Sequence, residues 1–272
     1  MVDSWDMLGR VHAAVGRAGD LVRQFVADPT PHPDAEEKSS SADLVTALDR
    51  RVEVMLLDEL RRIHPGAGII GEEGGWHGSR STAWIVDPVD GTTNIVHRVP
   101  HSAISVALIV DYIPMLGLVL NPFTGWTYVA TRDEGAFVAR NADFVDRTPL
   151  VVSTVDRLQR SLVSFGLPYD RAKADRTFDA ASRVFHVSQD LRRRGSAALD
   201  LASVASGEME AHFELDLKIW DIAAASLIVE EAGGRLTDWS GRAIVWSEVP
   251  SKLDIVASNG AVHRELLDAV DG

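Results

Sequence analysis

The sequence predicts an α+β fold in which two closely joined lobes form one domain of 272 residues. Residues 4–27, and the segment from about residue 46 to Pro65, place apolar residues at helical spacing. Between residues 102 and 138, short apolar segments alternate with turn sequences, which indicates an antiparallel meander. From about residue 150 onwards, predicted strands alternate with predicted helices, which favours a second, mixed sheet.

In the N-terminal half, the two helices define one packing surface. The first has Trp5 and Leu8 on its apolar face, and the second has Val52 and Leu56 in equivalent positions. The segment between them, residues 28–41, is polar and rich in proline, so we expect an exposed loop there.

In the C-terminal half, the elements are shorter. We expect strands at 161–165, 184–188 and 253–257, and helices at 197–206, 222–232 and 261–270. No internal repeat or long linker separates the halves, so we expect a single domain, 1–272, with an N-terminal lobe (1–149) and a C-terminal lobe (150–272).

Composition limits the possible partners and compartments. The formal net charge is −13, which disfavours a nucleic-acid partner, and the adjacent arginines 192–194 favour a solvated or interface role. No apolar run is long enough to span a bilayer, and no basic signal-peptide region begins the sequence. The absence of cysteine excludes disulfides and thiolate metal sites. We therefore expect a cytoplasmic protein with no membrane partner.

The segment from Trp84 to Asn94 carries the strongest chemical signal. An apolar strand-like run ends at Asp87, and two residues separate it from Asp90, so the two anions repel unless a cation lies between them. Gly91 and Thr92 can begin a helix whose N–H groups bind an anion such as phosphate. This loop therefore predicts metal-assisted phosphate chemistry.

Two long motifs resemble signatures of one family. Residues 87–94 resemble the D-P-[IV]-D-G-T-x-N signature of the inositol monophosphatase family, which comprises magnesium-dependent, lithium-sensitive phosphatases of the fructose-1,6-bisphosphatase-like superfamily. Residues 220–224 and 231–234 resemble its second signature, W-D-x-A-A followed by an apolar helix and E-A-G-G.

Two shorter motifs extend the resemblance. Residues 71–73 resemble the family's G-E-E, and residues 38–49 resemble its K-x-S-x-x-D-L-V-T-x-x-D segment, so that the resemblance spans about residues 38 to 260. It implies a layered α-β-α-β-α sandwich, with an antiparallel or mixed sheet in the N-terminal lobe and a mixed sheet with helices in the C-terminal lobe. It also implies a homodimer.

The resemblance implies a magnesium site with two or three ions. The family's metal ligands match Glu72, Asp87, Asp90, Asp221 and the carbonyl of Val89. These are all oxygen ligands, which magnesium prefers, and paired metal ions stabilise both the attacking and leaving oxygens.

The resemblance also assigns catalytic and phosphate-binding residues. A metal-activated water attacks phosphorus, and the residues that match Asp49 and Thr92 orient it, with Glu72 as a further catalytic residue. The N–H groups of Gly91 and Thr92 would hold the phosphate oxygens.

The polyol end of the substrate is expected at a less specific set of residues. They are Gly195, Ser196 and Ala197, from a segment that resembles the family's G-[ST]-[AG]-A, and Glu214, which matches a glutamate that hydrogen-bonds ring hydroxyls. The implied activity is hydrolysis of inositol 1-phosphate or a related polyol phosphate, a small-molecule phosphate ester.

Alternatives remain both for the roles of single residues and for the function of the chain. Each carboxylate alone is also compatible with a helix cap or a surface charge. The pair Asp87 and Asp90 with the following Gly-Thr-Thr favours metal binding, and the family match at all five carboxylate positions favours function. Histidinol phosphate and fructose 1,6-bisphosphate are alternative substrates. A non-catalytic, dimeric interaction protein is an alternative of a different class.

Two other motifs do not support a function. Residues 66–71 match the glycine pattern of dinucleotide-binding loops, but Glu72 and Glu73 follow where pyrophosphate would bind, so we expect a turn that delivers Glu72. His97 and His101 are separated by a proline, which argues against a helical zinc pair.

Overall fold

The computed structural model of the chain describes residues 4–28, 36–40, 43–45, 47–140, 146–248 and 252–272. Within these residues the helices are α1 (Ser4–Ala27), α2 (Ala47–Ile63), α3 (Thr92–Val96), α4 (Ala174–Val187), α5 (Ala197–Ala205), α6 (Ile219–Glu231) and α7 (His263–Asp271). None of them is long and apolar enough to span a membrane. Three short 3₁₀ turns are η1 (Leu158–Arg160), η2 (Arg171–Lys173) and η3 (Trp246–Glu248).

The strands form two mixed sheets and one two-stranded pair. The first sheet has the order β10-β9-β8-β7-β6-β5-β3-β4, and the second has the order β12-β11-β13-β15-β14. The strands of the first sheet are β3 (Gly68–Gly71), β4 (Gly75–His77), β5 (Ala83–Asp90), β6 (Ala103–Val110), β7 (Ile113–Leu120), β8 (Thr127–Thr131), β9 (Gly135–Ala139) and β10 (Thr148–Pro149). Those of the second sheet are β11 (Leu162–Phe165), β12 (Asp190–Arg192), β13 (Ala211–Leu217), β14 (Arg235–Asp238) and β15 (Leu253–Ser258).

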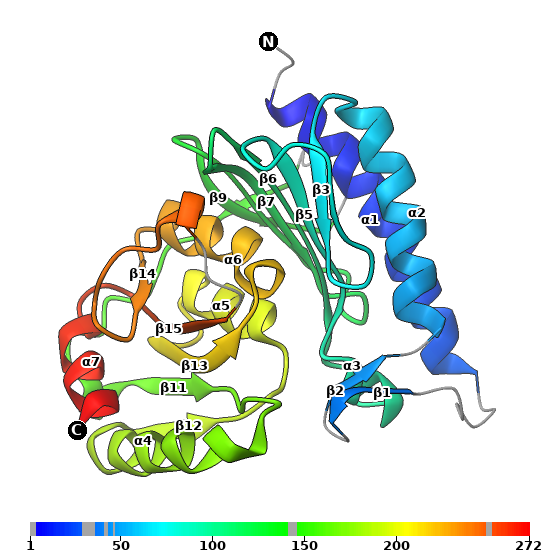
Figure 1. Cartoon of the computed structure of the whole chain (residues 1–272). Helices are drawn as coiled ribbons and strands as arrows, with labels where there is room; N and C mark the ends of the chain where they lie inside the picture. Colours follow the sequence, from blue (N-terminus) through cyan, green and yellow to red (C-terminus); the bar gives the residue numbers. More distant parts are fainter. Residues whose placement is uncertain (1–3, 29–35, 41–42, 46, 141–145, 249–251) are drawn as a thin grey trace.

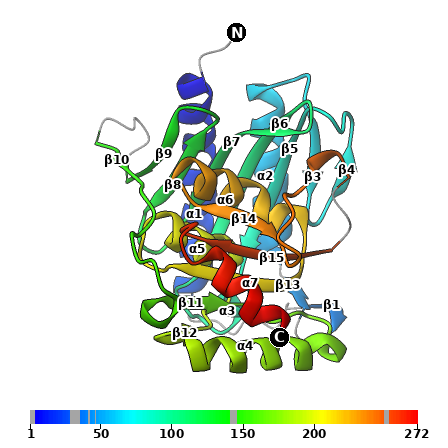
Figure 2. The ribbon, with the colours of Figure 1, turned by 90° about the vertical axis from the view of Figure 1, so that its left-hand side faces the viewer.

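The elements stack in five layers, which confirms the predicted α-β-α-β-α sandwich (Figure 1). Helices α1 and α2 cover one face of the first sheet, where Leu8 and Leu56 pack with Trp84 in one apolar core. Helices α5 and α6 fill the space between the sheets. Helices α4 and α7 cover the outer face of the second sheet, where Val184 and Leu266 join its core (Figure 2).

Helix α6 lies between the sheets and is apolar on all sides, as a helix enclosed by two sheets must be. Ile222, Leu227 and Ile228 are fully buried in the core that both sheets share. Gly117 on β7 allows a close approach, because a Cβ there would lie 2.5 Å from the Ala224 carbonyl oxygen of α6. This packing fixes α6 against the first sheet.

Most predicted elements are confirmed. The meander is β6 to β9, with antiparallel pairing between successive strands, and both long N-terminal helices are present. The strands of the first sheet all precede residue 150 and those of the second all follow it. The division into lobes at residues 149 and 150 stays a prediction.

Two predicted segments are wrong. Residues 184–187, expected to begin a strand, are the last turn of α4, because Thr177, Ala180, Ala181 and Val184 form a buried helical stripe that outweighs the local β-propensity of the run. Residues 36–40 of the expected loop are strand β1 (Glu36–Ser40), paired with β2 (Asp43–Val45). The other residues of that loop, apart from Asp28, lie outside the described residues.

Candidate functional site

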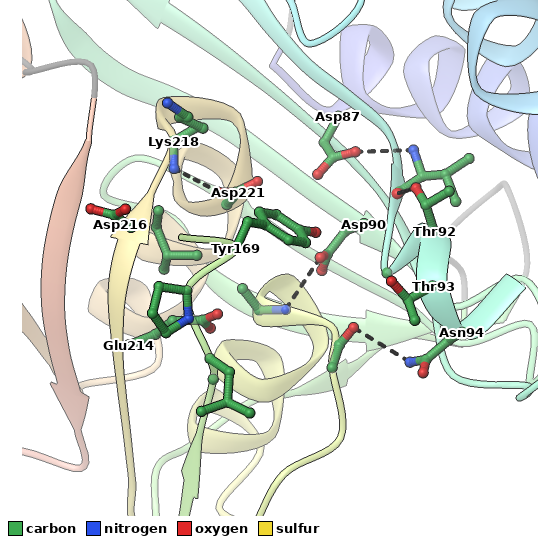
Figure 3. Close-up of a pocket in the computed structure, with 18 of the residues that line it drawn as sticks. Asp87, Asp90, Thr92, Thr93, Asn94, Tyr169, Glu214, Asp216, Lys218 and Asp221 are labelled. Atoms are coloured by element: carbon green, nitrogen blue, oxygen red, sulfur yellow. Dashed lines mark hydrogen bonds between the residues drawn. The ribbon is translucent and has the colours of Figure 1, made fainter. Parts of the chain in front are cut away.

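A cavity of about 680 Å³ lies where β5, α3, β13, α5 and α6 meet. Ten of the predicted site residues line it: Glu72, Asp87, Val89, Asp90, Gly91, Thr92, Gly195, Ala197, Glu214 and Asp221. The other two, Asp49 and Ser196, are buried behind its wall. Figure 3 shows the labelled carboxylates facing this space from several elements.

The end of β5 delivers two carboxylates to the cavity. Residues alternate along β5 between the α1–α2 core and the core that contains α5 and α6. The pairing of β5 with β6 is irregular between Asp87 and Asp90, and such a bulge re-aims a side chain that strict alternation would turn away. Asp87 also accepts a hydrogen bond from its own turn, with its Oδ1 3.0 Å from the Val89 nitrogen.

Asp90 is held by the start of α5. Its Oδ2 accepts from the Ser196 hydroxyl at 2.6 Å and from the Ala198 nitrogen at 2.8 Å, while its Oδ1 lies 3.3 Å from the Ala197 nitrogen. These donors belong to the N-terminus of α5, where a negative charge is favourable. Asp90 therefore caps a helix more than a hundred residues away in the sequence.

Glu72 and Asp221 reach the cavity from two other elements. Glu72 follows β3, and its nitrogen donates to the Val86 oxygen at 3.2 Å, next to Asp87 on the parallel strand β5. Asp221 lies in the first turn of α6 and accepts from the Lys218 nitrogen at 2.6 Å. The turn expected to deliver Glu72 is thus present.

Burial and mutual repulsion raise the pKa of carboxyl groups in this cavity. Burial raises the pKa of Asp87 well above its ordinary value, and repulsion by Glu72, Asp90 and Asp221 raises it further. Burial, then repulsion from Asp90 and Glu72, likewise raises the pKa of Asp221. Burial raises the pKa of Asp90 to about 6, although the donors Ser196 and Ala198 oppose the increase. So much buried negative charge is stable only when a cation or protons neutralise it.

The donor chemistry of these residues fits magnesium. All the available ligands are carboxylate or carbonyl oxygens, which suit a hard cation. Among the described residues, no three such side chains already converge on one point.

Asp49 and Thr92 form a buried pair beside the carboxylates. The Thr92 hydroxyl donates to the Asp49 Oδ1 at 2.8 Å, and it lies 3.1 Å from the Val89 oxygen. Asp49 is fully buried on α2. The structure thus brings together the two residues that the sequence predicted to orient water.

The loop after β5 packs tightly against the loop before α5. Gly91 has a φ of 94°, which favours glycine, and a Cβ there would lie 2.8 Å from the Gly195 oxygen. The Asn94 amide fixes the same contact, because its Nδ2 donates to the oxygens of His101 at 2.6 Å and Arg194 at 2.9 Å. Asn94 was not among the predicted site residues, although it belongs to the first signature.

Glu214 lines the opposite side of the cavity on β13. Its carboxylate occupies the space that a side chain at Gly166 would fill, since a Cβ there would lie 1.8 Å from the Glu214 Cδ. His212 lies behind it, with its Nε2 3.2 Å from the Glu214 Oε2 and its Nδ1 2.9 Å from the Ser164 hydroxyl. Burial raises the pKa of Glu214 to about 8, with Arg193 opposing the increase.

This raised pKa predicts a pH-dependent stability. Because folding raises the pKa of Glu214 from 4.5 to about 8, the folded chain binds more protons than the unfolded chain in this interval, and stability falls as pH rises through it. Glu214→Gln does not titrate. In EDTA, we expect its unfolding temperature to fall less than that of the wild type between pH 5 and pH 9. Glu208→Gln, at an exposed position, is the control, and parallel curves for Glu214→Gln and wild type would contradict the assignment.

The segment after Glu214 is fixed by ion pairs. Asp216 has a φ of 66° at a bulge of β13, and its carboxylate accepts from the ammonium groups of Lys173 and Lys252. Its charge thus joins β13 to η2 and to the residue before β15. The same pairs hold the loop after β11 beside the cavity.

Two groups of residues were missed by sequence reasoning. Tyr169 follows β11, lines the cavity and is half exposed, and Figure 3 shows its ring between Asp221 and Asp90. An aromatic residue after proline in a loop that follows a strand was the available signal. Arg193 also lines the cavity, whereas Arg194 donates to Asp200 at 2.7 Å. Arg193 therefore contributes to the cavity wall, which the solvated or interface role expected for the arginine cluster did not include.

Comparison with known proteins identifies the family. The profile of the inositol monophosphatase family matches residues 7–271. The chain belongs to the inositol monophosphatase family. This result confirms the resemblance seen in the two signatures.

Individual members of the family carry two kinds of name. An inositol-1-monophosphatase of Synechocystis sp. is 37% identical over 243 residues, covering 86% of this chain and 79% of the relative. A putative Nus factor SuhB of Neisseria meningitidis is 36% identical over 268 residues, covering 97% of both chains. The crystal structure of the extragenic suppressor protein suhB of Bartonella henselae has a TM-score of 0.85 at 31% identity, covering 97% of this chain and 98% of that one.

Proposed function

We propose that this chain is a magnesium-dependent phosphomonoesterase that hydrolyses inositol 1-phosphate or a related polyol phosphate to free polyol and phosphate. The observation that carries the proposal is the group of four carboxylates, Glu72, Asp87, Asp90 and Asp221, which line one cavity. Burial and repulsion by the others raise the pKa of Asp87 and Asp221. The relative from Synechocystis that is named an inositol-1-monophosphatase supports it.

In this proposal the four carboxylates and the Val89 carbonyl hold two or three magnesium ions. Bound magnesium would lower the pKa of a water molecule and stabilise the leaving oxygen. The hydrogen bonds from Val89 to Asp87 and from the start of α5 to Asp90 orient these ligands. Such outer contacts maintain ligand direction and metal affinity.

Asp49 and Thr92 orient the attacking water, together with Glu72. The Thr92 hydroxyl directs its hydrogen to the Asp49 Oδ1, so a lone pair of the Thr92 oxygen is available to accept a hydrogen bond from water. As the water gives its proton to the Thr92 oxygen, the Thr92 hydroxyl can pass its own hydrogen to Asp49. The N–H groups of Gly91 and Thr92, at the start of α3, hold phosphate oxygens.

The polyol lies towards Glu214, on the side of the cavity opposite the loop after β5, and Gly195 and Ala197 contact it from the start of α5. A carboxylate there accepts hydrogen bonds from hydroxyl groups and so favours polyols over apolar alcohols. Ser196 was also predicted to bind substrate, and this stays a prediction. Its buried hydroxyl donates to Asp90, which supports a role in orienting that ligand.

A screen of phosphate esters tests this proposal. We expect the largest kcat/KM for inositol 1-phosphate, with histidinol phosphate, fructose 1,6-bisphosphate and nucleotide phosphates as the competing substrates. EDTA should abolish turnover reversibly, and lithium should inhibit it. Asp221→Asn, purified in the same way, is the control for contaminating phosphatases. Preference for one of the competing esters would replace inositol 1-phosphate as the proposed substrate. The absence of turnover on every ester would contradict the proposed phosphatase activity.

The name Nus factor SuhB on relatives favours a second candidate, a dimeric interaction protein. A homodimer is compatible with both candidate functions. The presence of all the matched carboxylates around one cavity favours catalysis. The phosphate-ester screen separates the two, because an interaction protein requires no turnover.

A further inference from the structure

Glu53 is a buried carboxylate on α2 for which neither the family signatures nor the proposed mechanism gives a role. Its exposed fraction is 3%, and glutamate is seldom so deeply buried unless it is paired. It follows Asp49 by one helical turn, so both carboxylates lie on the same face of α2. Asp49 contacts Thr92, whereas the Glu53 Oε1 lies 3.2 Å from the backbone nitrogen of Glu73.

The turn that carries Glu72 is shaped around the Glu53 carboxylate. A Cβ at Gly71 would lie 1.9 Å from the Glu53 Oε1, and a Cβ at Gly74 would lie 3.6 Å from its Oε2. Gly71 does not adopt a positive φ, so its conformation does not require glycine. Glycine is required at position 71 because the Glu53 carboxylate occupies the space that a Cβ would fill.

Glu72 is therefore held on both sides. Its own nitrogen donates to the Val86 oxygen of β5 at 3.2 Å, and the next nitrogen, that of Glu73, donates to Glu53. These two contacts fix the peptide groups before and after the Glu72 Cα. The direction of the Glu72 side chain into the cavity follows from this backbone.

We propose that Glu53 is a positioning residue that holds the Gly71–Gly74 turn so that Glu72 can bind a divalent cation. This inference rests on the proposed role of Glu72 as a metal ligand. Residues that orient metal ligands typically change metal affinity by about 10–100-fold when they are replaced. Helix α2 then contributes two residues to the site. Asp49 contacts Thr92, and Glu53 positions Glu72.

The test measures Mn²⁺ binding, with the concentration of free Mn²⁺ monitored by electron paramagnetic resonance. We expect Glu53→Ala to raise the Kd for Mn²⁺ by about tenfold or more. Glu53→Gln keeps an oxygen that can accept from Glu73, so its Kd should stay within about threefold of the wild type. Glu59→Ala and Glu59→Gln, on the partly exposed surface of α2, are the matched controls and should bind as the wild type does.

A double-variant cycle separates positioning from general stability. Gly71→Ala alone should weaken Mn²⁺ binding, because the new methyl group and the Glu53 carboxylate cannot occupy the same space. In the Glu53→Ala background that space is open, so Gly71→Ala should add little further loss. If Glu53→Ala does not fold, the comparison of Glu53→Gln, Gly71→Ala and the wild type still tests the contact.

Three results would overturn the inference. They are wild-type affinity in Glu53→Ala, equal weakening by Glu53→Gln and Glu53→Ala, and additive losses for Gly71→Ala and Glu53→Ala. A wild-type chain that binds no Mn²⁺ has a different meaning. That result would overturn the metal site of the proposed function and the role of Glu53 with it.

Discussion

Asp87→Asn should lower turnover by about a hundredfold or more at a fixed magnesium concentration, while the metal-free chain becomes more stable. Replacing a direct metal ligand should reduce metal affinity at least as much as replacing a residue that only hydrogen-bonds to a ligand. The opposite change in stability follows from the raised pKa of Asp87, which reflects burial and repulsion by Glu72, Asp90 and Asp221. Removal of one buried negative charge relieves that repulsion, and the Asn oxygen can still accept from the Val89 nitrogen.

The measurements are steady-state kinetics with magnesium and thermal unfolding in EDTA at pH 7. Asp90→Asn is the matched comparison. It should also lose turnover, but without the same gain in stability. Both oxygens of Asp90 accept hydrogen bonds, so in either orientation the amide NH₂ group would face a donor, that of Ala197 or those of Ser196 and Ala198. A metal-free Asp87→Asn chain that unfolds at a lower temperature than the wild type would contradict this electrostatic account.

Thr92→Val should lower kcat by about a hundredfold with little change in KM. Valine has nearly the shape of threonine but lacks the hydroxyl that donates to the Asp49 Oδ1 at 2.8 Å. If Thr92 acts on the attacking water, the loss is confined to the transition state, which affects kcat more than KM. General-base and orienting groups commonly contribute rate factors of about 10²–10⁴.

Thr92→Ser is the control, because it retains the hydroxyl and should keep kcat within about tenfold of the wild type. Unfolding temperatures of both variants test whether Thr92→Val has changed the fold. A rise in KM without a fall in kcat would instead assign Thr92 to substrate binding. In that case the proposed orientation of water by Asp49 and Thr92 would be wrong.

The regular parts of the fold could be predicted because their sequence patterns are local. The meander of the first sheet alternates apolar segments with recognisable turns, and α1 and α2 show helical spacing. Residues 184–187 were misassigned because their β-branched and aromatic side chains outweighed a stripe of small residues, including Ala180 and Ala181. That stripe is buried only through packing on the second sheet, which the local pattern does not reveal.

The candidate site could be predicted from its motifs as far as ten of the residues that line the cavity. The connection between Asp90 and the start of α5 could not, because it joins positions 106 to 108 residues apart. Glu53 and Tyr169 were missed for similar reasons. Glu53 does interrupt the apolar face of α2, and a charge at that position was a usable signal. The position of Tyr169 depends on the loop after β11, whose path no periodic pattern determines.

Anomalous X-ray diffraction from crystals of the chain soaked in Mn²⁺ tests the central claim most directly. The account predicts at least one strong anomalous peak bounded by carboxylate oxygens of Glu72, Asp87 and Asp90 or Asp221, and loss of that peak in Asp87→Asn crystals. Peaks only elsewhere on the molecule, or an unchanged peak in Asp87→Asn crystals, would contradict it.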